Sequence, residues 1–327
     1  MVETSVLRSV LLAGSGAVAA DAPDAGVAAH YGDPFGEQRA LVAGRGFVDL
    51  SHRGVLRVFG PDRLSWLHSL TTQHLTELAP GTSTQALVLS PHGHIEHDLH
   101  VFDDGQTCWI TVEPGTAGAL AEFLDRMRFL LRVDVADLTE QYAAVWLPAD
   151  ARQTPSPVAM WISGRADLGE FAGREVVIPR ERLGDLGEFG PPAGVWAHEA
   201  LRIAATVPRL GLETDHRTIP HEIGLLGPAV HLNKGCYRGQ ETVARVHNLG
   251  RPPRRLVFLH LDGSDSELPA HGDPVEHDGR VVGFVTSAAR HHELGPIGLA
   301  LIKRNTPRDV PLTAGGIAAA AEVVVDA

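Results

Sequence analysis

The sequence predicts an α+β fold, in which helices and antiparallel strands form a mixed core and a small all-β unit follows at the C-terminus. Three observations lead to this prediction. A strand–turn–helix pattern occurs near residue 60, a run of short strands separated by turn sequences follows it, and the C-terminal segment contains only β-prone runs. At 327 residues the chain exceeds one ordinary core, so two or three domains are expected.

The first half of the chain alternates between strand and helix patterns. Residues 46–59 are expected to form a strand, Gly60-Pro61-Asp62 ends it, and the apolar residues of 64–70 recur at helical spacing. Three further strands are expected at 85–90, 94–102 and 107–112. Because turn sequences separate these three strands, we expect them to form an antiparallel meander.

The second half continues the mixed pattern and then becomes all β. Helices are expected at 118–127, 194–205 and 240–246, and strands at 129–135 and 143–147. Arg251-Pro252-Pro253-Arg254-Arg255 interrupts regular structure. Four β-prone runs beyond it indicate a small barrel or sandwich, at 256–261, 280–286, 297–302 and 320–325.

Composition limits the classes of function. Hydrophobic residues make up 44% of the chain and charged residues 21%, which is typical of a folded, soluble protein. The net charge of −12 disfavours non-specific binding to nucleic acid or to a membrane surface, and no apolar stretch has a membrane-spanning length. The two cysteines suit a reducing cytoplasm, where we expect the protein to act. Cys108, in a predicted strand, is expected to be a core residue.

Cys236 has the environment of a reactive thiol. It lies on a turn between two glycines, just before a helical segment with an acid, Glu241, in its first turn. Lys234 and Arg238 favour the thiolate, which attacks electrophiles and binds soft metals, while Glu241 opposes them. The alternative is that Cys236 packs as a small hydrophobic residue, which is the commoner fate of an isolated cysteine.

The complete string around this cysteine is more informative than the cysteine alone. It consists of Lys234, Gly235, Cys236, Tyr237, Arg238, Gly239, Gln240 and Glu241. The string resembles the KGCYxGQE motif of the YgfZ family, the folate-binding relatives of the T-protein of the glycine cleavage system. In this interpretation Tyr237 and Gln240 shape the turn, and Glu241 begins the helix or forms a charge pair.

The resemblance to the T-protein family extends from about residue 30 to residue 305. Residues 49–54 resemble the family's DxSHxG motif, and Asp98 falls on the catalytic aspartate of its GGIxDDL pattern. The resemblance implies a three-domain ring with a C-terminal β-barrel. We place the domains at 1–140, 141–250 and 251–327. It also implies that tetrahydrofolate, or a one-carbon derivative of it, binds in the central opening beside Asp98, whose carboxylate can accept ring N–H groups or hold charge there.

One departure from the family pattern bears on activity. The aminomethyltransferase pattern RLEA has a glutamate at the pterin edge, where this chain has Ala204, which carries no charge. Whether the protein is an enzyme therefore stays open at this stage. The YgfZ resemblance instead implies a folate-dependent role, with Cys236 and Asp98 as active residues, in assembling or repairing client iron–sulfur enzymes, including some that modify tRNA.

Three other interpretations remain open. The first is a folate-dependent aminomethyltransferase, in which Asp98 stabilises the charged folate nitrogen. The second is a metal site, because four potential ligands share one face of the strand at 94–100. The third assigns the arginines around residue 250 to RNA or phosphate, although we prefer Arg245 and Arg254 as partners for the carboxylates of a folate tail.

Overall fold

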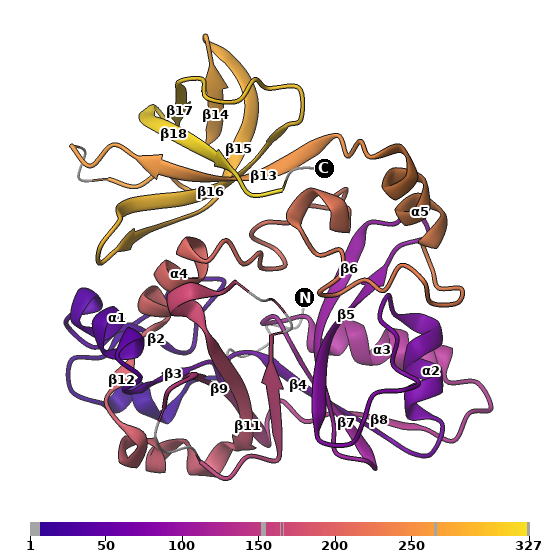
Figure 1. Cartoon of the computed structure of the whole chain (residues 1–327). Helices are drawn as coiled ribbons and strands as arrows, with labels where there is room; N and C mark the ends of the chain where they lie inside the picture. The colour runs from indigo at the N-terminus through magenta and orange to yellow at the C-terminus, as the bar shows by residue number, and fades with distance from the viewer. Residues whose placement is uncertain (1–6, 152–154, 164, 166, 265–266, 326–327) are drawn as a thin grey trace, which may run out of the picture.

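The chain folds into three lobes in the computed structural model, and each lobe is built on its own β-structure (Figure 1). Two lobes contain a five-stranded sheet, and the third is a closed barrel. The α+β prediction and the C-terminal barrel are therefore confirmed. The structure describes residues 7–151, 155–163, 165, 167–264 and 267–325. Within these residues, no helix has the length and apolar character needed to cross a bilayer.

The first sheet has the strand order β5-β6-β7-β4-β8. Its strands are β4 (Gly54–Phe59), β5 (Thr82–Leu89), β6 (Ile95–Asp103), β7 (Thr107–Val112) and β8 (Asp134–Asp137). Strands β5, β6 and β7 pair antiparallel in sequence order, which confirms the predicted meander. Helices α2 (Arg63–Leu70) and α3 (Ala117–Met127) pack on one face through residues such as Trp66 and Leu120. Cys108 of β7 is fully buried in this core, as expected.

The strand predicted at 129–135 begins only at Asp134. The preceding residues form an exposed turn, in which Phe129 has 90% of its surface accessible. The backbone N–H of Arg132 donates to the carboxylate of Asp62, at 2.9 Å. Because this contact holds the chain against the turn that follows β4, pairing with β4 starts two residues later.

The strands of the second sheet come from segments of the chain that precede and follow the segment of the first sheet. Its order is β10-β11-β9-β3-β12. The strands are β3 (Phe47–Asp49), β9 (Tyr142–Pro148), β10 (Ala159–Ile162), β11 (Gly173–Pro179) and β12 (Pro192–Ala193). The strand predicted at 46–59 is thus two strands in different sheets, because a turn closed by the Arg53 N–H and the Leu50 carbonyl (2.9 Å) separates β3 from β4.

Two helices and a short hairpin complete the second lobe. Helices α1 (Pro34–Val42) and α4 (Val195–Ala204) pack together, and residues of both join the apolar core with β3 and β9. The hairpin of β1 (Val18–Ala19) and β2 (Ala28–His30) contacts α4 through β2. The helix predicted at 194–205 is therefore confirmed as α4, the element that forms one wall of the site described below.

The C-terminal lobe is a barrel rather than a sandwich. Its strands are β13 (Arg254–Leu261), β14 (Pro274–His277), β15 (Arg280–His291), β16 (Gly295–Lys303), β17 (Leu312–Ala314) and β18 (Ile317–Val323). The barrel closes where β13 pairs with β18, and fully buried residues such as Val257 and Val285 fill it. Helix α5 (Gln240–Leu249) precedes the barrel and carries Glu241 in its first turn, as the sequence predicts.

Where the three lobes meet, charged side chains are buried beside an apolar cluster that also takes residues from all three lobes. A connected network of buried or nearly buried side chains lies there, formed by Asp24, Arg53, Glu113, Glu175, Glu199, Arg202, Arg209 and Glu213. Arg209 pairs with Glu113 of the first lobe at 2.7 Å, and Arg202 of α4 pairs with Glu213 at 2.9 Å. Glu213 also accepts a hydrogen bond from Thr286 of barrel strand β15, at 2.9 Å. The network therefore connects the two sheet lobes through ion pairs and reaches the barrel through a hydrogen bond.

Replacing Arg202 by methionine tests the network. The Arg202→Met variant leaves Glu213 buried without its cation, so the free energy of unfolding should fall by about 3–5 kcal/mol. The control is Arg182→Met, because the side chain of Arg182 is 40% exposed and its acidic partner is 3.9 Å away, so a change below about 0.5 kcal/mol is expected. Urea unfolding followed by circular dichroism measures both. Equal changes in the two variants would show that the network contributes no more than a surface pair.

Candidate functional site

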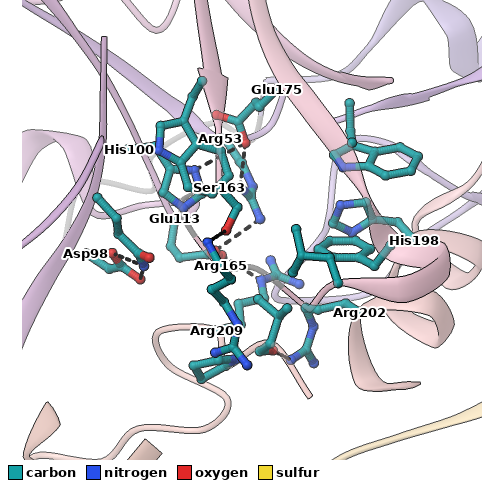
Figure 2. Close-up of a pocket in the computed structure, with 18 of the residues that line it drawn as sticks. Arg53, Asp98, His100, Glu113, Ser163, Arg165, Glu175, His198, Arg202 and Arg209 are labelled. Carbon is teal, nitrogen blue, oxygen red and sulfur yellow. Dashed lines mark hydrogen bonds and ion pairs between the residues drawn. The ribbon is translucent and has the colours of Figure 1, made fainter. Parts of the chain in front are cut away.

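A cavity lies beside the charged network, between the two sheet lobes (Figure 2). It encloses about 60 Å³. Strand β6 contributes Asp98 and His100, the second lobe contributes Trp146 and Trp161, and α4 contributes Arg202. Acidic, basic and aromatic side chains from separate elements therefore converge on one space.

Asp98 is the acid of this cavity that has no cation partner among the described residues. Both of its carboxylate oxygens accept hydrogen bonds from the side-chain amide of Gln85, at 2.8 and 2.9 Å. Burial raises the pKa of Asp98, and the charge of His100 and the hydrogen bonds from Gln85 offset only part of that effect. A ligand N–H group or positive charge beside Asp98 would therefore bind with favourable electrostatics.

Flat aromatic side chains form much of the remaining wall. Trp161 of β10 stacks on His100, with ring centroids 3.6 Å apart and the planes at 2° to each other. The Trp161 indole N–H donates to the main-chain carbonyl of Thr84, at 3.1 Å. Trp146 and Phe171 also stack, with centroids 5.5 Å apart. Such walls suit a planar heteroaromatic ligand.

The other acids of the cavity are held by arginines. Arg53 pairs with Glu175 at 2.7 Å and with Glu113 at 3.2 Å. Burial alone would raise the pKa of Glu113, but Arg209 and Arg53 outweigh it and the pKa is lowered. For Glu175, burial is likewise outweighed by Arg53 and His100, so its pKa is lowered too. These two acids stay ionised and fix the wall of the cavity.

Cys236 is exposed but does not line the central cavity. The neighbouring Arg238 pairs with Glu96 of β6, at 2.8 Å. The ammonium of Lys234 donates to three main-chain carbonyls around the end of α2, those of His68, Thr71 and Gln73. Burial lowers the pKa of Lys234 to about 8. Both cations thus have partners of their own, which hold the loop, and their effect on the thiol stays a prediction.

Two glycines let the cysteine loop pack against the turn before β6. Gly239 has φ +82°, and a Cβ there would lie 2.5 Å from the carbonyl oxygen of Ser90. Gly93, in that turn, also has φ +82°, and a Cβ there would lie 2.7 Å from Thr242 in α5. Tyr237 is only 9% exposed and packs in the apolar cluster below the loop. The glycine and tyrosine of the motif therefore position the loop.

The two arginines predicted to bind a folate tail lie away from the cavity. Arg254 pairs with Asp215 at 2.6 Å and with Glu222 at 2.8 Å, and Arg245 is exposed on α5. Sequence reasoning did not single out several residues that line the cavity, including Arg53, Gln85, Trp161, Arg165 and Glu175. No local pattern marks them, because each comes from a different turn or strand.

The proposed metal ligands of 94–100 do not converge. Alternate residues of a strand are about 6.5–7 Å apart, too far for one ion to bind all four. Among the described residues, one group brings three potential ligand atoms within 4.8 Å, namely Glu170, His291 and His292. The Nδ1 atom of His291 accepts two backbone N–H groups, at 3.2 Å each, so its Nε2 carries the proton and cannot bind a metal. The structure gives the metal alternative no support.

Comparison with known proteins agrees with this architecture. Residues 24–148 match the GCVT N-terminal domain, and residues 254–326 match the glycine cleavage T-protein C-terminal barrel domain. An aminomethyltransferase of Synechococcus sp. strain WH7803 is 30% identical over 287 residues, which cover 75% of each chain. A protein of Arabidopsis thaliana named as a chloroplastic transferase is 27% identical over 292 residues, covering 79% of this chain but 65% of that one. The glycine cleavage system aminomethyltransferase T of Bartonella henselae shares the fold, with a TM-score of 0.76, 19% identity and coverage of 94% of this chain and 93% of that chain.

The three-lobed fold, the domain matches and the relatives define a T-protein-like protein. The chain belongs to the glycine cleavage T-protein family. These matches do not separate the YgfZ branch from the rest of the family, and that finer assignment still depends on the string around Cys236. Ala204, where the family pattern has glutamate, packs against an apolar cluster rather than lining the cavity.

The lowered pKa of Glu113 predicts a pH dependence of stability. The folded state binds this proton more weakly than the unfolded state, whose value is near 4.5, so the stabilisation is complete above that value and lost as the pH falls below it. We expect the free energy of unfolding to fall with pH below about 5, and Glu113→Gln to show a shallower fall. Urea unfolding at a series of pH values measures this, with the exposed Glu188→Gln as control. A pH slope that Glu113→Gln leaves unchanged would contradict the argument.

Proposed function

We propose that the chain binds a tetrahydrofolate in the central cavity and acts as a folate-dependent aminomethyltransferase of the T-protein type. The observation that carries the proposal is the half-buried carboxylate of Asp98, which lines the cavity, has a raised pKa and has no cation partner among the described residues. Several relatives carry the name aminomethyltransferase, which supports the same chemistry.

The chemical types of the residues that line the cavity suit a reduced pterin, but the cavity has to widen before the ring can bind. Its volume of about 60 Å³ is small beside the roughly 300–1,000 Å³ of typical ligand pockets. Trp161 lies on β10, the edge strand of its sheet, so it can move with few backbone hydrogen bonds broken. We therefore expect the ring to bind where the Trp161 indole stacks on His100.

Each wall residue has a part in this proposal. Bound tetrahydrofolate would supply the nitrogen that takes up the one-carbon unit. Asp98 would hold the positive charge near that nitrogen, and Gln85 keeps the carboxylate oriented. Among the described residues, no hydrogen bond reaches His100 Nδ1, which lies 3.6 Å from Glu175, so it can contact the ring as a further polar group.

Asp98 has to act without a second free carboxylate. The position of the family's glutamate is Ala204, and Glu113 and Glu175 are both held by Arg53. Transferase activity would therefore depend on Asp98 to a greater extent than in relatives that retain the glutamate.

A second candidate is the folate-dependent maintenance of iron–sulfur enzymes, which the YgfZ-like string implies. The observation that favours it is the exposed thiol of Cys236, on a loop held in place by Lys234 and Arg238. A client protein can reach a thiol in that position without entering the cavity. This candidate uses the same folate site and has iron–sulfur enzymes, including ones that modify tRNA, as partners.

Calorimetry of tetrahydrofolate binding to Asp98→Asn tests the folate site. The affinity should fall at least about tenfold, because a neutral amide cannot provide a charge-assisted contact. Stability at neutral pH should stay equal or rise, since the substitution removes a half-buried carboxylate whose pKa is raised. The exposed Glu122→Gln serves as a matched control. Undiminished affinity in Asp98→Asn would exclude the proposed role of this residue.

Cys236→Ala separates the two candidates. If the transferase proposal holds, wild type and Cys236→Ala both release ammonia from an aminomethyl-carrying donor when tetrahydrofolate is added, because the thiol lies outside the cavity. If the iron–sulfur proposal holds, neither releases ammonia, and cells with Cys236→Ala lose client-enzyme activity. Ammonia assays of the purified proteins and client assays in cells give the two readouts.

A further inference from the structure

We infer that Arg165 recognises the anionic tail of the ligand, at the boundary between the central cavity and an open hollow on the surface. This inference rests on the proposed folate site and adds the residue that selects the carboxylate-bearing tail. The geometry points to Arg165 because it lines both spaces. The hollow measures about 630 Å³ and is also lined by Thr84, Asp167 and Pro228.

Arg165 differs from the other arginines of the cavity. Arg53, Arg202 and Arg209 each form ion pairs with at least two acids. In the part of the chain that the structure describes, the guanidinium of Arg165 has no hydrogen bond or ion pair. Burial lowers its pKa, and the charge of Asp167 offsets part of that effect. A half-buried cation without a direct partner is stabilised when an anion binds to it.

The wall of the cavity and the wall of the hollow meet at one hydrogen bond. Trp161 lines the cavity, Thr84 lines the hollow, and the hydrogen bond from the Trp161 indole to the Thr84 carbonyl (3.1 Å) joins them. If the indole moves aside for the ring, the cavity opens towards the hollow at this bond. The tail of a bound folate would then leave past Arg165, on the same side as the displaced indole.

The tail that fits this boundary is a carboxylate group, the charged part of the p-aminobenzoylglutamate end of a folate. Arginine binds a carboxylate through two parallel N–H bonds, which fixes direction as well as charge. The chain has a net charge of −12, so most of its surface repels such a tail. One cation at the mouth of the cavity therefore provides direction as well as affinity, and Arg254, held by Asp215 and Glu222, is not available for this role.

Two probes that share the reduced ring test the assignment. Tetrahydrofolate carries the tail, whereas 6-methyltetrahydropterin does not. In calorimetry, Arg165→Gln should weaken tetrahydrofolate binding by about ten- to a hundredfold and leave 6-methyltetrahydropterin binding within about twofold of wild type. Arg280→Gln, at an exposed arginine of barrel strand β15, is the matched control and should change neither. Thermal unfolding of each variant shows that the fold is retained.

The outcomes distinguish the inference from the proposed function. If wild type binds neither probe, the folate proposal fails and the inference fails with it. A second outcome is that wild type binds both probes while Arg165→Gln changes neither affinity or lowers both equally. In that case the proposed folate site is retained, and Arg165 does not recognise the tail. A selective loss for tetrahydrofolate in Arg165→Gln supports the assignment.

Discussion

Arg209 lies where the three lobes meet, and the ion pairs around it constrain the rest of the structure. Its side chain is 5% exposed and pairs with Asp24, Glu113 and Glu199, which come from the N-terminal segment, the first lobe and α4. Removing such charges from water costs several kcal/mol per ion, and the cost is recovered only when every ion finds its partner. Partners from separate lobes meet in one arrangement only. We infer that the network favours this arrangement of the lobes over other compact ones.

Of the carboxylate and guanidinium groups that line the cavity, two lack a direct ion pair among the described residues. Among the described residues, the half-buried carboxylate of Asp98 is held by the neutral amide of Gln85, and the half-buried guanidinium of Arg165 has no hydrogen bond or ion pair. The surrounding acids and arginines neutralise one another and fix the wall. A charged group that has no ion partner in the free protein can form one with a ligand. Such groups therefore mark where a ligand gains binding energy. The functional argument therefore depends on what the network leaves unpaired rather than on the network itself.

Local patterns in the sequence predict much of the fold but little of this cavity. The pattern predicts β7 to the residue, because turn sequences on both sides bound an apolar run. It fails at 46–59, where β3 and β4 belong to different sheets, since the turn at Arg53 is set by contacts with residues far along the chain. Buried Arg53 and partly exposed Arg182 look alike in sequence, and only tertiary packing distinguishes them. A family motif identifies Asp98 from the sequence alone, whereas no comparable signal marks Gln85, Trp161 or Arg165.

The cysteine motif of residues 234–241 and the central cavity lie in separate places, and strand β6 connects them. Cys236 does not line the cavity, yet Gly239 of its loop touches the turn at Gly93, and β6 leaves that turn to carry Asp98 into the cavity. Arg238 adds a second contact to the same strand through Glu96. If events at the thiol and at the folate site depend on each other, a shift of β6 is the shortest mechanical route between them. The motif therefore serves the fold by holding the start of β6, whatever chemistry its thiol performs.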